Sequence, residues 1–283
     1  MFVDRQEIAG ELLEEQSRVQ AHRMRTRDLS KYNAIIFSAD YSSILTFVDT
    51  EVPGAQSLEG VLEGLATRPS SQKTHWADMA GGFAIGMRQV AHGFAGPDAA
   101  KVAMSCVDLF DWEGESDEED IKGISEISGV DMHDKQPNLI VANAETVDLP
   151  EPADVVTSVE GIQYFYNPLA AVANWYNQLN ENGLLFVARL PLLPWSGNIT
   201  QAGTDEQTLF TRIFDNFTQN GVSFAVEGPG TKDDPDFSLL ALQRKEGTRL
   251  QQNAEVLQVT TDTEDYKSVV YTSDSPALEV VLS

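Results

Sequence analysis

Acidic and amide side chains follow four apolar runs of the 283-residue chain, at the point where each run ends. Asp78 ends the run THWAD and precedes a turn of small residues, Ala80–Ala84, while Asp108 ends KVAMSCVD, Asn143 follows NLIVA and Glu160 follows ADVVTSV. A carboxylate at a strand end can accept hydrogen bonds from a ribose diol. A turn without bulky side chains lets backbone N–H groups at a helix N-terminus approach the polar groups of a ligand. The pattern therefore predicts a pocket for an adenosine-containing cofactor.

The elements that position these side chains alternate between apolar runs and amphipathic segments. The runs are mostly continuous rather than alternating, which is typical of strands that are covered on both faces of a sheet. They lie at 74–78, 101–107, 138–142, 154–159, 184–189, 222–227 and 237–243. Helices are expected from near Phe83 and over 117–128, 168–180 and 205–219. This alternation predicts an α/β fold with a doubly wound, mostly parallel seven-stranded sheet. The carboxyl ends of its strands then meet at one edge, where ligands bind.

Two dipeptides set the expected limits of the helix over 168–180. Asn167-Pro168 supplies an N-cap side chain and a proline at the first helical position. Asn182-Gly183 supplies residues that tolerate the left-handed conformation in which many helices end, so we expect the helix to stop there.

The segments outside this pattern differ in composition. Residues 1–71 are expected to form an N-terminal helical cap, with one helix over 4–28 and a second over 56–67. Residues 72–246 form the predicted α/β domain, and 247–283 form an extension of short strands or a partly ordered tail. The N-terminal helices are a candidate surface for a homodimer.

The charge balance limits the partners of the protein. The chain has 19 basic and 44 acidic residues, a net charge of −25, which repels phosphate backbones and anionic lipids. We therefore expect no nucleic-acid and no membrane partner. A neutral or cationic small molecule, or a basic protein, fits this charge better, and we expect a small molecule as the acceptor. The acidic run 113–120 lacks the ligand spacing of a calcium loop, so no metal site is predicted.

Cysteine content and hydropathy favour a cytoplasmic protein. Cys106 is the one cysteine, which excludes an intrachain disulfide, and its apolar neighbours indicate a buried, inert thiol. The first residues are too acidic for a signal peptide, and the chain has no apolar run of about 18 residues.

Five motifs in order resemble a known family. They read DMAGGFA, VDLF, NAETVDLP, ADVVTSVEGIQYFYNP and LNENGLLFV, and they look like those of class I S-adenosylmethionine-dependent methyltransferases, closest in style to the small-molecule, quinone-biosynthesis-like type. The resemblance covers about 75–245. It implies a Rossmann-like methyltransferase fold, S-adenosylmethionine as cofactor and S-adenosylhomocysteine as product.

The resemblance assigns the first two strand ends to the methionine and ribose parts of the cofactor. The family pattern acid-x-Gly-x-Gly-x-Gly falls on Asp78, Ala80, Gly82 and Ala84, so only one glycine is kept and the motif is degenerate. Because alanine restricts positive φ, the loop is expected to stand slightly off the cofactor. The implied cofactor-binding residues here are Asp78, Ala80, Gly81, Gly82, Asp108 and Leu109, with Asp108 on the ribose hydroxyls.

The third and fourth strand ends are assigned to adenine and to the reaction. Asn143 and Ala144 are implied to recognise adenine. Glu160 is also an implied cofactor-binding residue and lies where the methyl donor meets the acceptor. The implied reaction is an in-line displacement at the sulfonium methyl, so the enzyme supplies mainly orientation. A base is needed only if the acceptor must lose a proton. Glu160 and Tyr164 are the catalytic candidates, and other base or positioning candidates are Tyr166, His92 and His133.

Two other functions are compatible with the same pattern to a lesser degree. A methyltransferase-like protein without catalysis, acting as a binding or regulatory module, would explain the alanines at 80 and 84 and the asparagine at 143. A nicotinamide dehydrogenase fits less well, because the turn lacks the complete Gly-x-Gly-x-x-Gly pattern.

Overall fold

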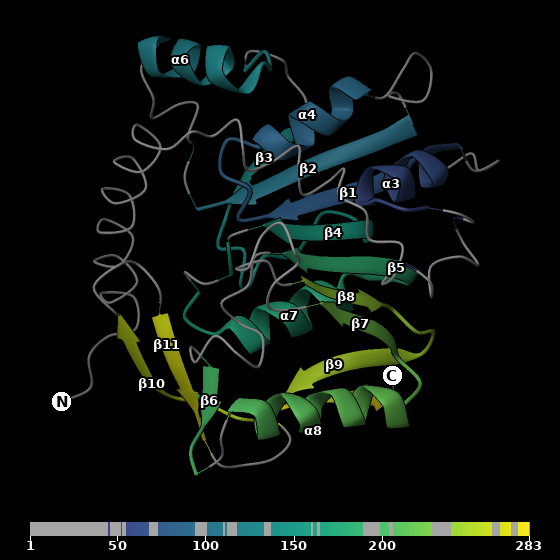
Figure 1. The fold of residues 1–283 in the computed structure, drawn as a ribbon, viewed down its shortest axis with the longest axis vertical. Coiled ribbons are helices and arrows are strands. Elements are labelled where there is room, and N and C mark those ends of the chain that lie inside the picture. Colours follow the sequence, from purple (N-terminus) through teal and green to yellow (C-terminus); the bar gives the residue numbers. More distant parts are fainter. Residues whose placement is uncertain are drawn as a thin grey trace.

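Seven strands form one sheet in the computed structural model, in the order β3-β2-β1-β4-β5-β8-β7 (Figure 1). Their bounds are β1 Thr74–Met79, β2 Val102–Asp108, β3 Asn138–Val141, β4 Ala153–Val159, β5 Leu179–Ala188, β7 Ser223–Glu227 and β8 Leu239–Gln243. The structure describes residues 45, 52, 55–67, 73–93, 101–109, 111, 118–132, 137–159, 161–162, 165–188, 199–203, 206–227, 239–261, 267–272 and 277–282.

The pairing of the strands defines the fold class. The strands β3, β2, β1, β4 and β5 are parallel, and β8 runs antiparallel to both β5 and β7. Each of the seven predicted runs overlaps one of these strands, and the order and directions are those of the Rossmann-like methyltransferase fold. The predicted fold class is therefore confirmed. The strand order reverses between β1 and β4, which makes this pair the topological switch point.

Helices cover both faces of the sheet because successive strand residues point to opposite sides. On β1, Trp76 belongs to a buried cluster with the helices α3 (Leu58–Thr67) and α4 (Ile85–Gly93). The next residue, Ala77, belongs to the cluster that contains α7 (Pro168–Asn177) and α8 (Glu206–Gln219). A smaller apolar cluster joins the start of α4 to α6 (Glu118–Ser128).

The start of α7 agrees with the sequence, but its end does not. Asn167 caps the helix, its side chain accepts from Ala170 N, and proline follows at the first position. The helix ends at Asn177, and Asn182, with φ of 63°, lies inside β5 where the β4–β5 register shifts. The expectation that Asn182-Gly183 ends the helix is therefore wrong. An Asn-Gly pair serves a strand irregularity as well as a helix terminus, since both need a left-handed residue.

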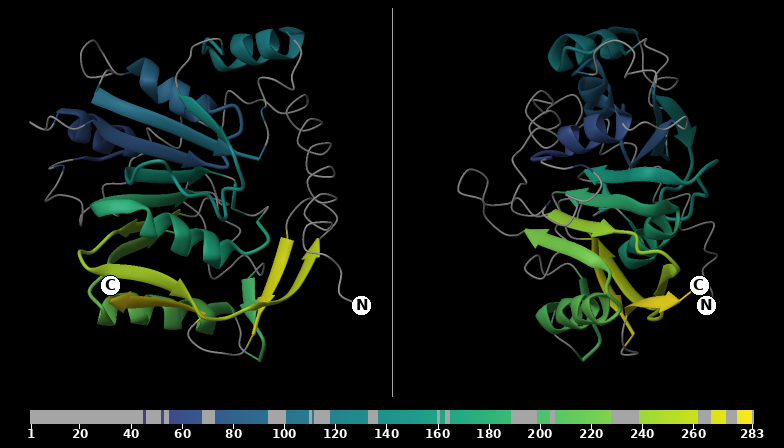
Figure 2. Two further views of the ribbon diagram at one scale, coloured as in Figure 1. Left: turned by 180° about the vertical axis from the view of Figure 1, so that it is seen from behind. Right: turned by 90° about the vertical axis from the view of Figure 1, so that its right-hand side faces the viewer.

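Further strands lie beside the main sheet (Figure 2). They are β6 Ile199–Gln201, β9 Thr248–Gln252, β10 Val256–Thr261, β11 Lys267–Tyr271 and β12 Leu278–Leu282. They form one sheet in the order β10-β11-β6 and a second pair, β12-β9, of which β9 contacts α7 and β12 contacts α8. None of the described helices is long and apolar enough to cross a membrane. The helix expected over 4–28 lies outside the described residues, so the cap and the dimer surface stay predictions.

Candidate cofactor-binding site at the β1–β4 switch point

The turn after β1 has a left-handed backbone at three alternate positions. The φ angles are 57° at Ala80, 56° at Gly82 and 55° at Ala84. These are the three positions that the family pattern assigns to glycine. Alanine here takes up the conformation that glycine usually supplies, at a cost of about 1–2 kcal/mol per residue.

Hydrogen bonds to the end of β2 hold this turn in place. Ala80 N and Gly81 N both donate to Val107 O, at 2.8 and 3.3 Å. Gly82 N donates to Asp108 Oδ2 at 2.9 Å. Asp108 is half-buried at the strand end, and a carboxylate has about four lone-pair sites, of which this contact uses one.

The two glycines of the turn face different surroundings. A Cβ added to Gly81 would lie 2.6 Å from Asp78 Oδ2 and 2.6 Å from Cys106 Sγ, so the turn rests directly on these two side chains. A Cβ added to Gly82 would meet no atom of the described residues within 4 Å. The backbone at Gly82 therefore borders open space, as a cradle for a ligand requires.

Asp78 lies buried beneath the turn in a short chain of hydrogen bonds. Trp76 Nε1 donates to Thr157 Oγ1 at 3.0 Å, and Thr157 Oγ1 donates to Asp78 Oδ1 at 2.6 Å. Burial raises the pKa of Asp78 to about 7, with a further increase from Asp108 and an opposing decrease from the Thr157 hydroxyl. The carboxyl group of Asp78 therefore changes its charge near neutral pH.

Cys106 has no sign of reactivity. It is 1% exposed, and burial raises the pKa of its thiol well above the ordinary value, as do the carboxylates of Asp78 and Asp108. A thiol of this kind stays protonated and inert, in agreement with the sequence.

The loop after β3 joins the end of β2 through Ala142 N, which donates to Asp108 O at 2.8 Å. Asn143 is exposed, and its Oδ1 accepts from Glu145 N at 2.9 Å, so the side chain closes its own turn. One lone pair of that oxygen is used inside the loop and a second can face a ligand. Ala144 is buried, and its carbonyl accepts from Trp175 Nε1 at 2.7 Å.

The chain after β4 passes close to the same turn. A Cβ on Gly161 would lie 2.5 Å from Ala80 Cβ and 3.1 Å from Ser158 Oγ. Ser158 is fully buried, and its hydroxyl has no hydrogen-bond partner among the residues that the structure describes. The sequence places Ser158 at the end of the fourth apolar run, but no role was predicted for it.

The structure brings together the predicted residues at the ends of β1, β2 and β3. It does not describe the two catalytic candidates that follow β4. Asp78, Ala80–Gly82 and Asp108 are in mutual contact, and the loop with Asn143 adjoins them through Ala142. The described residues do not include the catalytic candidates Glu160 and Tyr164, and they give no side-chain environment for His92 or His133. Tyr166 is 46% exposed.

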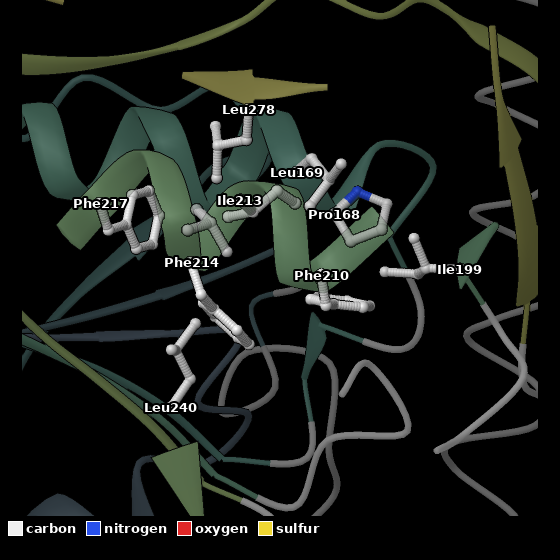
Figure 3. A pocket seen from close by; sticks show the side chains of 10 residues that line it. Pro168, Leu169, Ile199, Phe210, Ile213, Phe214, Phe217, Leu240 and Leu278 are labelled. Carbon is white, nitrogen blue, oxygen red and sulfur yellow. The ribbon is translucent and has the colours of Figure 1, made fainter. Parts of the chain in front are cut away.

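An apolar cavity lies elsewhere, between α7, α8 and β8 (Figure 3). Its volume is ≈ 30 Å³, and its ten lining side chains are all apolar, among them Phe210, Phe214 and Leu240. A space of this size holds about one or two waters, and none of the predicted site residues lines it. Its size and its wholly apolar lining do not suit a nucleoside.

No family model and no curated protein matches the sequence. Among solved structures, the chain is similar to an rRNA methylase from Streptococcus thermophilus, with 13% identity and a TM-score of 0.42 over 66% of this chain and 94% of that one. It is similar to magnesium protoporphyrin IX methyltransferase from Synechocystis PCC 6803, with 14% identity and a TM-score of 0.41 over 71% and 85% of the two chains. For the CMeT domain of citrinin polyketide synthase the identity is 15% and the TM-score 0.42, over 71% of this chain and 56% of that one. Identities of this size assign no role to any residue of the site.

Proposed function

We propose that this chain is an S-adenosylmethionine-dependent methyltransferase that acts on a small-molecule acceptor. The observation that carries the proposal is the turn 80–84, which is left-handed at all three positions of the family's glycine pattern and lies at the switch point of the sheet. Asp108 holds this turn through Gly82 N. The turn, the strand order and the acid thus support one cofactor class together.

The described residues fit this cofactor in shape and charge. The open space at Gly82 allows a ligand to approach the backbone. The carboxylate of Asp108, which accepts from Gly82 N, lies beside this space and favours a cationic ligand such as a sulfonium with an α-amino group. In this proposal Asp108 and Leu109 bind the ribose side, Asn143 and Ala144 the adenine side, and Gly81 and Gly82 the methionine side.

The protein's own part in the reaction is mainly orientation. S-adenosylmethionine supplies an activated methyl group, so a protein that aligns donor and acceptor lowers the barrier without further activation. Glu160 follows β4 directly, between Val159 and Gly161, and we propose that it and Tyr164 position the acceptor or accept its proton.

A small, non-anionic acceptor is favoured by charge. The chain carries 44 acidic and 19 basic residues, and such a field lowers the local concentration of polyanions. The style of the motifs supports a small-molecule methyltransferase of the quinone-biosynthesis-like type.

Isothermal titration calorimetry with S-adenosylmethionine and S-adenosylhomocysteine tests the cofactor. Asp108→Ala should weaken binding at least about tenfold, because it removes charge-assisted hydrogen bonds to the ribose and the support of the turn. Asp154→Ala is the matched control: Asp154 Oδ2 also accepts a backbone N–H, from His75 at 2.8 Å, but near the amino end of β4. Absence of binding by either ligand at high micromolar concentration refutes the enzyme and favours a binding or regulatory module. Equal affinity of Asp108→Ala and wild type shows that the cofactor is misplaced.

A further inference from the structure

We propose that Tyr271, on β11 near the C-terminus, is a positioning residue for the cofactor loop 142–147 and acts on it through Asn167 and Glu145. The inference rests on the proposed function, because that function assigns this loop to adenine. It gives the strands after residue 247 a role at the site, although they lie outside the main sheet.

Glu145 fastens the loop to the start of α7. Its Oε1 accepts from Tyr166 N at 2.5 Å, and its Oε2 accepts from Asn167 N at 3.0 Å. Both donors are backbone N–H groups just before the first turn of the helix, where a carboxylate is also favoured by the helix dipole. The position of Glu145, and with it Asn143 and Ala144, therefore depends on where the chain at 166–167 lies.

Tyr271, on β11, holds the start of α7 through hydrogen bonds to Asn167 and Leu169. Its hydroxyl donates to Asn167 Oδ1 at 2.9 Å and accepts from Leu169 N at 3.1 Å. Asn167 Nδ2 also donates to Gln252 Oε1 on β9 at 3.0 Å. The N-cap of α7 is thus held between two C-terminal strands on one side and the cofactor loop on the other.

The hydroxyl of Tyr271 is suited to this permanent role. The side chain is 0% exposed, and burial raises the pKa of Tyr271 well above the usual range of a phenol, with a further increase from the Glu145 carboxylate. The group therefore stays protonated and donates to Asn167 throughout the physiological pH range. Removing it takes away the acceptor that Leu169 N has among the residues that the structure describes, which favours displacement of the N-cap.

A second set of contacts holds the same loop along α7. Trp175 Nε1 donates to Ala144 O, and Asn174 Nδ2 donates to Glu145 O at 3.3 Å and to Val147 O at 3.0 Å. Because these contacts do not involve the extension, loss of Tyr271 should shift the loop rather than release it. We therefore expect weaker cofactor binding and a folded protein.

The experiment compares Tyr271→Phe with Tyr176→Phe. Tyr176 is also a fully buried phenol bonded to the C-terminal part, to Thr248 Oγ1 at 2.8 Å and Lys245 N at 3.1 Å, but at the far end of α7. The two variants lose similar hydrogen bonds, so a purely structural role predicts the same result for both. Calorimetry with S-adenosylhomocysteine and amide hydrogen exchange of residues 142–147 in the ligand-free protein are measured for each.

Tyr271→Phe should weaken S-adenosylhomocysteine binding roughly fivefold to tenfold, the loss expected for one or two hydrogen bonds, and should speed exchange at Glu145, Thr146 and Val147. Tyr176→Phe should leave both unchanged. If wild type does not bind the ligand, the proposed function fails, while the exchange comparison still tests the positioning. Equal exchange in both variants overturns the inference. If Tyr271→Phe does not fold by circular dichroism, Asn167→Ser replaces it, since serine caps helices well but is too short to retain the contact.

Discussion

The variant Asp78→Asn tests how much the ionisation of the buried Asp78 carboxyl group destabilises the folded protein. The pKa of Asp78 is raised from 3.8 to about 7, chiefly by burial. At acid pH, below both values, the carboxyl group is protonated in the folded and unfolded states and has no effect on stability. Between these two values the unfolded chain has released the proton and the folded protein has not, so the free energy of unfolding falls as pH rises. It levels off above the folded pKa.

The size of the effect follows from the difference between the two pKa values. About three units at 1.36 kcal/mol each give roughly 4 kcal/mol of lost stability at the alkaline limit. Asparagine does not titrate and can still accept from Thr157 Oγ1. The free energy of unfolding of Asp78→Asn should therefore exceed that of wild type by a margin that grows by about 3 kcal/mol between about pH 5 and about pH 8.

Urea unfolding of both proteins at several pH values measures this margin. A margin that stays constant with pH would mean that Asp78 ionises normally and would refute the reasoning. Thr157→Val gives an independent check. It removes the hydrogen bond that lowers the pKa of Asp78, so the loss of stability should extend to higher pH than in wild type.

Two further pairs of variants test the contacts of the turn. Gly81→Ala should destabilise by about 3 kcal/mol, because its Cβ would overlap the carboxylate and thiol beneath it. Gly82→Ala should cost only about 1–2 kcal/mol for its positive φ while weakening S-adenosylhomocysteine binding. Urea unfolding and calorimetry measure both, and the opposite ranking in stability would contradict the packing described. Gly161→Ala should destabilise by about 2 kcal/mol through contact with the methyl of Ala80. In an Ala80→Gly background most of that loss should disappear, whereas additive effects in the double-mutant cycle would show that the two loops do not touch.

The main sheet could be predicted from sequence because its signals are local. Most of its strands contain a continuous apolar run, and the helix start at Asn167-Pro168 depends on two adjacent residues. The end of the same helix could not be predicted, because Asn182-Gly183 suits both a helix terminus and the register shift that it occupies in β5. Only the pairing of β5 with β4 and β8 decides between these, and that information is not local.

Part of the candidate site could likewise be predicted from local sequence signals, and part could not. Placement of Asp78 and Asp108 at strand ends followed from the apolar runs and the parallel sheet. The contact between Tyr271 and Asn167 spans 104 residues and involves a strand whose position no local pattern indicates. The raised pKa of Asp78 could not be predicted from the sequence either, since it depends on the depth of burial and on Thr157 from another strand.

The alanines at 80 and 84 show why a degenerate motif need not mean a lost shape. The preference for glycine at a left-handed position is about 1–2 kcal/mol. Against it, Ala80 N donates to Val107 O at 2.8 Å and Ala84 N to Gly81 O at 2.9 Å, while Gly82 N donates to Asp108. Hydrogen bonds of this kind contribute about 1 kcal/mol each, and a buried N–H without a partner costs more. The surrounding strands therefore determine the backbone, and the side chains at these positions only adjust its stability. The feature of the motif that cannot be exchanged is the absence of a Cβ at Gly81, where the carboxylate and thiol below leave no room.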